Sequence, residues 1–267
     1  MLIDTHRHLD FGAYDDDRVE VLARATAAGV QRILIPGLDL DNGRAILRLA
    51  EGDGRLVAAV GVHPNSSAGW QDSWLAELRE LARHPKVVAI GEIGLDYYWD
   101  KSPQATQWRA FAAQLQLAAE LGLPVIIHNR EADADTVQLL ADSPAARRPS
   151  AGVLHSFAGD VAMAEAALAL NFYLGFTGPL TYKNGQTMRD VAEQTPLDRL
   201  LLETDGPFLA PQQRRGKRNE PAYLIHIAEQ LAALHNLSLA EISAITTANA
   251  ARLFGEKTIK DFADYAA

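Results

Sequence analysis

The chain has 267 residues, a hydrophobic fraction of 48%, a formal net charge of −9 and no cysteine. It is long enough to bury a large core, so we expect one domain over residues 1–267; the missing cysteines exclude disulfides, thiolate metal sites and cysteine nucleophiles, and the acidic balance argues against a broad basic face for nucleic acid. Without a leader pattern or a segment long and uncharged enough to span a bilayer, the chain is expected to be soluble and cytoplasmic.

Eight short apolar, β-branched runs recur along the chain and are typical of strands buried on both faces. They lie at residues 1–6, 32–37, 56–62, 86–94, 124–129, 151–157, 171–178 and 199–205. Helix-like segments fill nearly every gap; residues 104–121, for example, place Trp108, Phe111 and Leu115 at helical spacing before Gly122. Strands alternating with helices build a parallel sheet, and eight such units predict an α/β fold, a single (β/α)₈ TIM barrel.

The first predicted strand runs into the sequence His6-Arg7-His8. Side chains alternate across a strand, so the two histidines are expected to point the same way and Arg7 the opposite way. An isolated pair of this kind is more often a surface accident than a site. Whether this histidine pair belongs to a functional site therefore depends on the residues at the ends of the other predicted strands.

Four later predicted strands end in side chains of the same chemistry: Glu92, His128, His155 and Asp205. Taken singly, each such residue is more often structural than functional. In a (β/α)₈ barrel, however, the carboxyl ends of the strands meet at the face where active sites are built. Five strand ends of this kind predict one shared site.

Four histidines and two carboxylates exceed the needs of one tetrahedral cation. They fit two divalent ions about 3.5–4 Å apart with a bridging carboxylate. We assign His6, His8 and Asp205 to one ion, His128 and His155 to the other, and Glu92 to both. Nitrogen and oxygen ligands admit Zn²⁺, Mn²⁺ or Mg²⁺ without choosing among them.

The expected chemistry is hydrolysis by a water that two metals activate, which needs no serine or cysteine nucleophile. Asp205 and Glu92 are the expected catalytic residues: Asp205 would bind metal and accept the proton of the water, and Glu92 would join the ions. Glu203 lies on the same side of the strand as Asp205. We expect it to orient a ligand rather than bind the metal itself.

The motifs DTHRHLD, GVHP, GEIGLDYY, PVIIHNREA, HSFAG, LLETDGPFLAP and RGKRNEP together resemble the TatD-type deoxyribonucleases of the amidohydrolase-like superfamily, from the first residues to about Asn249. The resemblance implies a (β/α)₈ barrel, two divalent ions and removal of nucleotides from DNA ends. The metal positions of the family fall on the six residues already assigned. Arg7 stands where the family more often has a small residue, and Gly206 where it often has Ala or Ser; both departures should leave the ligands intact.

Substrate contacts are expected around this site. His63, in GVHP, is expected to contact a substrate phosphate; the alternative is that it only caps the rim of the cavity. The basic run at 214–221 follows the eighth predicted strand, so Arg215, Lys217 and Arg218 are candidates to hold a phosphate backbone; a solvated charge run is the alternative. Three aromatic side chains after the fourth strand are candidates either to stack on a base or to pack: Tyr97, Tyr98 and Trp99.

The expected function is hydrolysis of DNA phosphodiester bonds by a 3′→5′ exonuclease acting on single-stranded DNA or on ends, with no membrane association and no obligate protein partner. The alternative is an amidohydrolase or esterase acting on another substrate, such as an aminoacyl-tRNA ester, because the same activated water attacks carbonyls. Many amidohydrolases bridge their metals with a modified lysine, and Glu92 at that place favours the nuclease. A non-catalytic scaffold ranks last, since it would be expected to have lost ligands.

Overall fold

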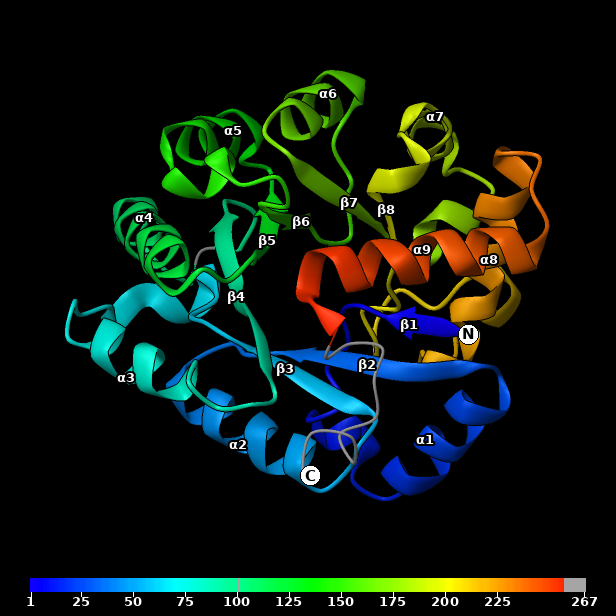
Figure 1. The fold of residues 1–267 in the computed structure, drawn as a ribbon, viewed down its shortest axis with the longest axis horizontal. Helices are drawn as coiled ribbons and strands as arrows, with labels where there is room; N and C mark the ends of the chain where they lie inside the picture. The colour runs from blue at the N-terminus through cyan, green and yellow to red at the C-terminus, as the bar shows by residue number, and fades with distance from the viewer. Residues whose placement is uncertain (100, 257–267) are drawn as a thin grey trace.

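A computed structural model describes residues 1–99 and 101–256 of the chain. Eight parallel strands follow one another in a single sheet. They are β1 (Leu2–Asp4), β2 (Val30–Pro36), β3 (Leu56–Val60), β4 (Val87–Asp96), β5 (Val125–Arg130), β6 (Gly152–Leu154), β7 (Phe172–Phe176) and β8 (Leu200–Leu202). Figure 1 shows them around the centre with helices outside, so the predicted (β/α)₈ barrel is confirmed, as a nearly closed barrel.

The helices between the strands cover the outside of the barrel, and the last helix of the described residues lies across one end of it (Figure 1). They are α1 (Arg18–Ala27), α2 (Leu40–Glu51), α3 (Trp74–Leu81), α4 (Gln104–Leu121), α5 (Asp133–Asp142), α6 (Val161–Ala169), α7 (Gln186–Gln194), α8 (Leu224–Leu234) and α9 (Leu239–Phe254). Helix α4 has the predicted bounds, and Gly122 ends it with a φ of 69° that few other residues adopt. Among the helices of the described residues, none is both long and apolar enough to cross a membrane.

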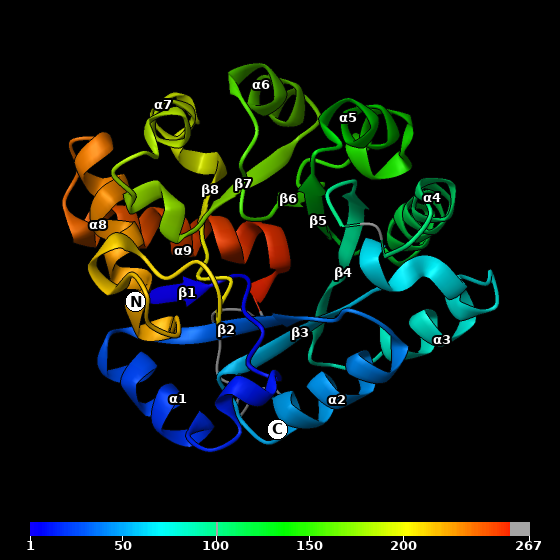
Figure 2. The ribbon, with the colours of Figure 1, turned by 180° about the vertical axis from the view of Figure 1, so that it is seen from behind.

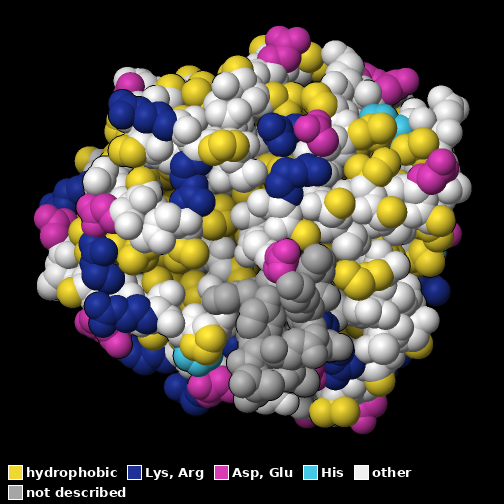
Figure 3. Space-filling model, viewed as in Figure 1, with side chains coloured by type: hydrophobic (Ala, Val, Ile, Leu, Met, Phe, Trp, Pro, Cys, Tyr) yellow, Lys and Arg dark blue, Asp and Glu magenta, His cyan; other side chains and the backbone are white. Residues whose placement is uncertain are grey.

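The inside of the barrel is filled with apolar side chains at the end that α9 covers. Leu253 and Phe254 of α9 join a buried cluster that includes Ile3, Val88 and Ile126 from the strands. On this face of the molecule, basic and acidic side chains are interspersed (Figure 3). The opposite end, seen from behind in Figure 2, carries the carboxyl ends of the strands and is therefore where polar groups can gather.

The barrel is joined between its first and last strands by backbone hydrogen bonds. Thr5 N donates to Leu202 O at 3.1 Å, and Asp205 N donates to His6 O at 2.9 Å. These bonds place the residues after β1 beside those after β8. Two segments about two hundred residues apart in sequence thus share one edge of the barrel mouth.

Most strands differ in length from the prediction, and β1, β6, β7 and β8 are clearly shorter than predicted. β1 and β8 end at Asp4 and Leu202, because the segments beyond them bond across to other partners, such as Arg7 N to Leu34 O at 3.0 Å. β4 continues to Asp96 after a shift of register between Ile90 and Ile93. Glu92 therefore lies within β4 rather than at its end, which corrects the predicted position.

Candidate metal centre

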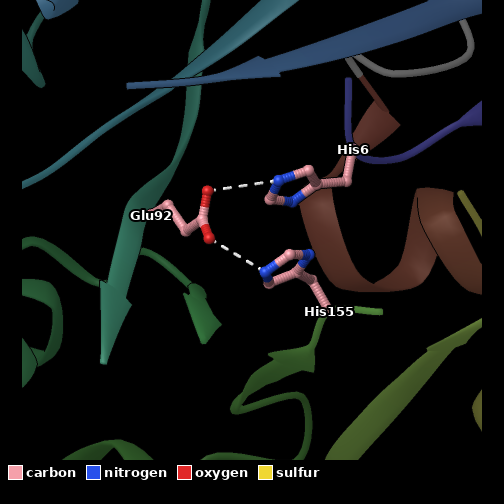
Figure 4. A group of neighbouring side chains, drawn as sticks. All are labelled: His6, Glu92 and His155. Carbon is pink, nitrogen blue, oxygen red and sulfur yellow. Dashed lines mark ion pairs between the residues drawn. The ribbon is translucent and has the colours of Figure 1, made fainter. Parts of the chain in front are cut away.

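The carboxylate of Glu92 lies at the centre of a group of histidines. Its Oε1 is 2.9 Å from both His128 Nδ1 and His155 Nε2. Its Oε2 is 3.3 Å from His6 Nε2 and 3.6 Å from His8 Nε2. Figure 4 shows His6 and His155 approaching the carboxylate from different strands. Residues from β4, from β5 and from the ends of β1 and β6 thus meet at one point.

Asp205 completes this group from the turn after β8. Its Oδ1 is 3.9 Å from His6 Nε2 and 3.7 Å from His8 Nε2. The potential ligand atoms of these three side chains lie within 4.8 Å of one another, as do those of His6, Glu92 and His155. The structure therefore brings together the residues that the sequence predicted as ligands.

His63 also lies inside the group. Its Nε2 is 3.4 Å from Glu92 Oε1, and its ring centroid is 4.4 Å from that of His128. Its Nδ1 accepts the N–H of Asn65 at 3.0 Å, which turns Nε2 towards Glu92. Glu92, His128 and His63 form a further set of neighbouring potential ligands, in which His63 takes the place predicted for His155. A phosphate contact of His63 stays a prediction.

The charge of Glu92 governs the protonation of its neighbours. Burial opposes ionisation of Glu92, but the surrounding histidines, His155 first, outweigh it and hold its pKa well below the usual range. Burial also opposes protonation of His155, yet Glu92 raises the pKa of His155 to about 9. Burial lowers the pKa of His8 to about 4 and that of His6 well below its usual value. Neutral imidazoles of His6 and His8 keep a lone pair for a cation.

Several nitrogens of the group are buried without a hydrogen-bond partner. Among the described residues these include both ring nitrogens of His6 and the Nδ1 atoms of His8 and His155. Buried polar atoms left unpaired are costly and rare, so a ligand is the simplest explanation for them. Imidazole nitrogens around a carboxylate are also the donors that Zn²⁺ and Mn²⁺ take in proteins. The residues present therefore fit a divalent metal.

Asp96, at the end of β4, is a part of the site that the sequence analysis missed. Its buried carboxylate oxygen Oδ2 lies 3.0 Å from His128 Nε2, so the two ring nitrogens of His128 face Glu92 and Asp96. A carboxylate on the far nitrogen of a metal-binding histidine fixes the orientation of its ring. The signal was present in GEIGLD, because strand alternation places Asp96 on the same side as Glu92.

Glu203 contacts the backbone beside a candidate ligand. Its Oε2 accepts the N–H of Ser156 at 2.8 Å, next to His155, and its Oε1 accepts the hydroxyl of Thr5 at 3.2 Å. The carboxyl group is fully buried over Gly175, where any Cβ would lie 2.3 Å from it. Burial raises the pKa of Glu203 to about 7. These contacts fit the predicted orienting role.

The three predicted phosphate contacts after β8 differ in their surroundings. Arg218 forms ion pairs with Asp17 at 2.7 Å and Glu220 at 3.2 Å, which argues against its predicted phosphate contact because its charge is already neutralised. Arg215 lies over the ring of Tyr182, with Cζ 4.4 Å from the centroid. Within residues 1–99 and 101–256, neither Arg215 nor Lys217 has a carboxylate partner.

Arg7 points away from the histidines, as predicted. It is fully buried; Nη1 donates to Thr204 Oγ1 at 2.9 Å, and Nη2 donates to Asn219 O at 2.7 Å and to the hydroxyl of Tyr14. A Cβ on Gly206 would lie 2.1 Å from Arg7 Nη1. The glycine therefore makes room for the guanidinium, and the two departures noted in the motifs explain each other.

The family model, the related sequences and the solved structures that match this chain all point to the same family. Residues 3–255 match the family described as TatD related DNase. A protein of Bacillus subtilis named uncharacterized metal-dependent hydrolase YabD is 46% identical, over 95% of this chain and 99% of its own. A 3′-5′ ssDNA/RNA exonuclease TatD of Musicola paradisiaca is 38% identical, over 95% and 97%. The crystal structure of YjjV, a TatD homologue from Escherichia coli, superposes with a TM-score of 0.88 at 35% identity, over 95% and 97% of the two chains.

Proposed function

Because the chain belongs to the TatD-related DNase family and is a metal-dependent hydrolase, we propose that it hydrolyses phosphodiester bonds of single-stranded DNA as a 3′→5′ exonuclease. The observation that carries this proposal is the group of buried histidines around Glu92, with ring nitrogens that have no other partner among the described residues. A relative named as an exonuclease on single-stranded DNA and RNA supports the choice of substrate.

Two divalent ions are proposed, held by His6, His8 and Asp205 on one side, by His128 and His155 on the other, and by Glu92 between them. When bound, such ions polarise a phosphate and lower the pKa of a water molecule. Zn²⁺, Mn²⁺ and Mg²⁺ all accept these ligands, and the experiment below tests each.

Asp205 is proposed to take the proton of the attacking water. Burial raises the pKa of its carboxyl group to about 6 before any metal is bound, against the opposing effect of His155. A carboxylate within hydrogen-bond reach of the water can accept its proton. Its side chain is 15% exposed, more than the 3% of Glu92, so it lies nearer the entrance from which substrate arrives. Glu92, buried among histidines, is proposed to hold the ions rather than to move protons.

The phosphate backbone is proposed to lie along the cations at the barrel mouth. Arg215 and Lys217 are free of carboxylate partners among the described residues, and His63 reaches Glu92 Oε1 to within 3.4 Å. A short local set of cations is compatible with the net charge of −9, because only the nucleotides near the cleaved bond need to be held. The expected binding is therefore weak and sensitive to salt.

The test uses the full chain reconstituted separately with each of the three metals. Single-stranded DNA blocked at the 5′ end should be shortened, the same strand blocked at the 3′ end should stay intact, and a chelator should abolish the shortening. Matched RNA strands and an aminoacyl ester are run in parallel, with Glu92→Gln as the control for contaminating nuclease. Cleavage of the ester with intact DNA would overturn the proposal in favour of an esterase.

A further inference from the structure

The exposed aromatic rings of the described residues gather at one end of the barrel. They belong to Tyr98, Trp99 and Phe208, with exposed fractions of 50%, 47% and 57%. Tyr98 and Trp99 follow β4, and Phe208 follows β8, so all three lie at the carboxyl ends of strands that contribute to the candidate metal centre. Exposed apolar surface collected beside a polar site is typical of a binding surface rather than of chance.

The first group of rings, the β4 platform, consists of Tyr98, Trp99, Lys101 and Arg130. The rings of Tyr98 and Trp99 meet edge to face, with centroids 4.9 Å apart. Arg130 Cζ lies 4.2 Å from the Tyr98 centroid, and Lys101 Nζ lies 5.7 Å from that of Trp99. In the described part of the chain, neither cation has a carboxylate partner. The platform thus presents apolar faces together with the positive charges of Lys101 and Arg130.

The β4 platform is attached directly to the candidate metal centre. Asp96 Oδ1 accepts the backbone N–H groups of Tyr98 and Trp99, at 3.1 and 3.0 Å. The other oxygen of the same carboxylate lies 3.0 Å from His128 Nε2. Asp96 therefore holds the aromatic loop in a set position relative to a candidate metal ligand. Tyr97 belongs to the interior instead, since its hydroxyl donates to Asp135 at 2.6 Å and its ring packs on the core.

The second group, the β8 platform, consists of Phe11 and Phe208. Their ring centroids are 6.1 Å apart. Phe11 also stacks on the candidate ligand His8, with centroids 4.9 Å apart and planes at 21°. In a barrel with the strand order β1 to β8, strands β4 and β8 stand across the mouth from each other. The two platforms therefore flank the candidate metal centre on opposite sides.

We propose that the two platforms are base-stacking subsites that hold a single-stranded polynucleotide across the barrel mouth, with one nucleotide on each side of the bond to be cleaved. The inference rests on the proposed function and names the way its substrate is bound. Unpaired bases offer a flat face whatever their sequence, and aromatic side chains stack on that face. Lys101 and Arg130 supply charge for the adjoining phosphates. Bases inside a duplex are already stacked, so the platforms favour free strands and frayed ends.

The test measures binding of an oligothymidylate with phosphorothioate linkages, which resist hydrolysis, to the metal-loaded full chain. Stacking on Trp99 should quench tryptophan fluorescence, and Trp99→Phe should remove most of that quenching while keeping the affinity. Trp99→Ala and Phe208→Ala should each weaken binding about 5- to 100-fold, the range for one stacked base. An abasic strand of equal length should bind weakly and should not distinguish wild type from Trp99→Ala.

Leu197→Ala is the matched control, because Leu197 is 37% exposed and precedes β8 at the other end of the barrel. It should bind the oligothymidylate like wild type. An oligouridylate arm shows whether RNA uses the same subsites. Unchanged affinity in both Trp99→Ala and Phe208→Ala would overturn the inference.

A second measurement separates this inference from the proposed function. Methyl 4-nitrophenyl phosphate is a diester without a base, and the platform variants should hydrolyse it with the kcat of wild type while their KM for oligothymidylate with ordinary linkages rises. If the platform variants hydrolyse both substrates with the KM of wild type, the stacking subsites are contradicted and the proposed nuclease activity stands. Hydrolysis of neither substrate by wild type would contradict the nuclease itself.

Discussion

The two sides of the segment His6-Arg7-His8 differ in how far their buried polar atoms are hydrogen-bonded. On the histidine side, buried ring nitrogens have no hydrogen-bond partner among the described residues. On the Arg7 side, the guanidinium is bonded to Thr204, Tyr14 and Asn219. Both sides are buried and polar, and only strand-like alternation separates them. Unpaired ring nitrogens mark the side prepared for a ligand. On the Arg7 side both Nη atoms are bonded and only Nε of the guanidinium lacks a partner among the described residues, so this side holds the fold together.

The Arg7 side joins the first strand to the loop after the last one. Asp4 accepts the N–H of Thr204 at 2.9 Å, and Asn219 Nδ2 donates to Thr204 O at 2.7 Å. Burial raises the pKa of Asp4 to about 6, although Arg7 opposes this. The network thus positions Asp205, one residue beyond Thr204, without contacting the candidate metal centre. Its loss should affect stability first, whereas loss of the histidine side should affect activity first.

Asp205→Asn is expected to give the largest effect. Removal of a general base and metal ligand should lower kcat on single-stranded DNA by about 10²–10⁴. Asn tolerates the left-handed φ of 51° at this position better than Ala does, so the fold should persist. Steady-state kinetics and the melting temperature, measured on the same preparation, separate the two effects. A normal kcat would remove Asp205 from the proposed chemistry.

Arg7→Met is expected to act on stability instead. It removes the buried hydrogen bonds of Arg7 to Thr204, Tyr14 and Asn219. Each acceptor left unpaired should lower the free energy of unfolding by about 1–3 kcal/mol, measured by urea denaturation. Metal affinity in the folded protein should stay within a few-fold of wild type, by calorimetry. A large loss of metal affinity without loss of stability would reverse the roles given to the two sides.

Gly206→Ala provides a control for this network, because the added methyl group would lie 2.1 Å from Arg7 Nη1. We expect it to destabilise wild type and to cost much less in an Arg7→Ser background. A double-mutant cycle, measured by urea denaturation, gives the coupling energy between the two positions. If the two losses of unfolding free energy were additive, Gly206 would not be needed to make room for Arg7.

Removal of the metal should destabilise the protein through the histidine side only. Metal at about a thousand times its Kd should contribute about 4 kcal/mol to the free energy of unfolding. This increment is the difference between the chelated and the reconstituted protein in urea denaturation. Arg7→Met should retain it and Glu92→Gln should lose it. If metal still raised the free energy of unfolding of Glu92→Gln by the same amount, the metal would have to bind at another site.

Asp96→Asn should give the smallest effect. The variant keeps the shape of the side chain but weakens its hold on His128 Nε2, so metal affinity should fall about 10- to 100-fold. Competition with a chromogenic chelator measures this without any turnover. Asp72→Asn is the matched control, because its side chain is 72% exposed and pairs with Arg109 rather than with a candidate ligand. Equal affinities in the two variants would show that Asp96 does not position His128.

The sequence alone determined the barrel and most of the candidate site. Apolar runs with helices between them predict the order of the strands from the local pattern alone. Residues at the carboxyl ends of parallel strands must lie close together, so the sequence suffices to group His6, His8, Glu92, His128, His155 and Asp205. The bounds of β1, β6, β7 and β8 were less accurate, because bonds to other segments can end a strand early.

Only the tertiary structure decided which polar groups are already paired. The ion pairs of Arg218, the contact of Asp96 with His128 and the space that Gly206 leaves for Arg7 each join different strands or loops. Arg7 and Asn219, for example, are 212 residues apart in sequence. The sequence identifies residues by their type and spacing. Whether a buried polar or charged group has a partner depends on which side chain the fold places beside it.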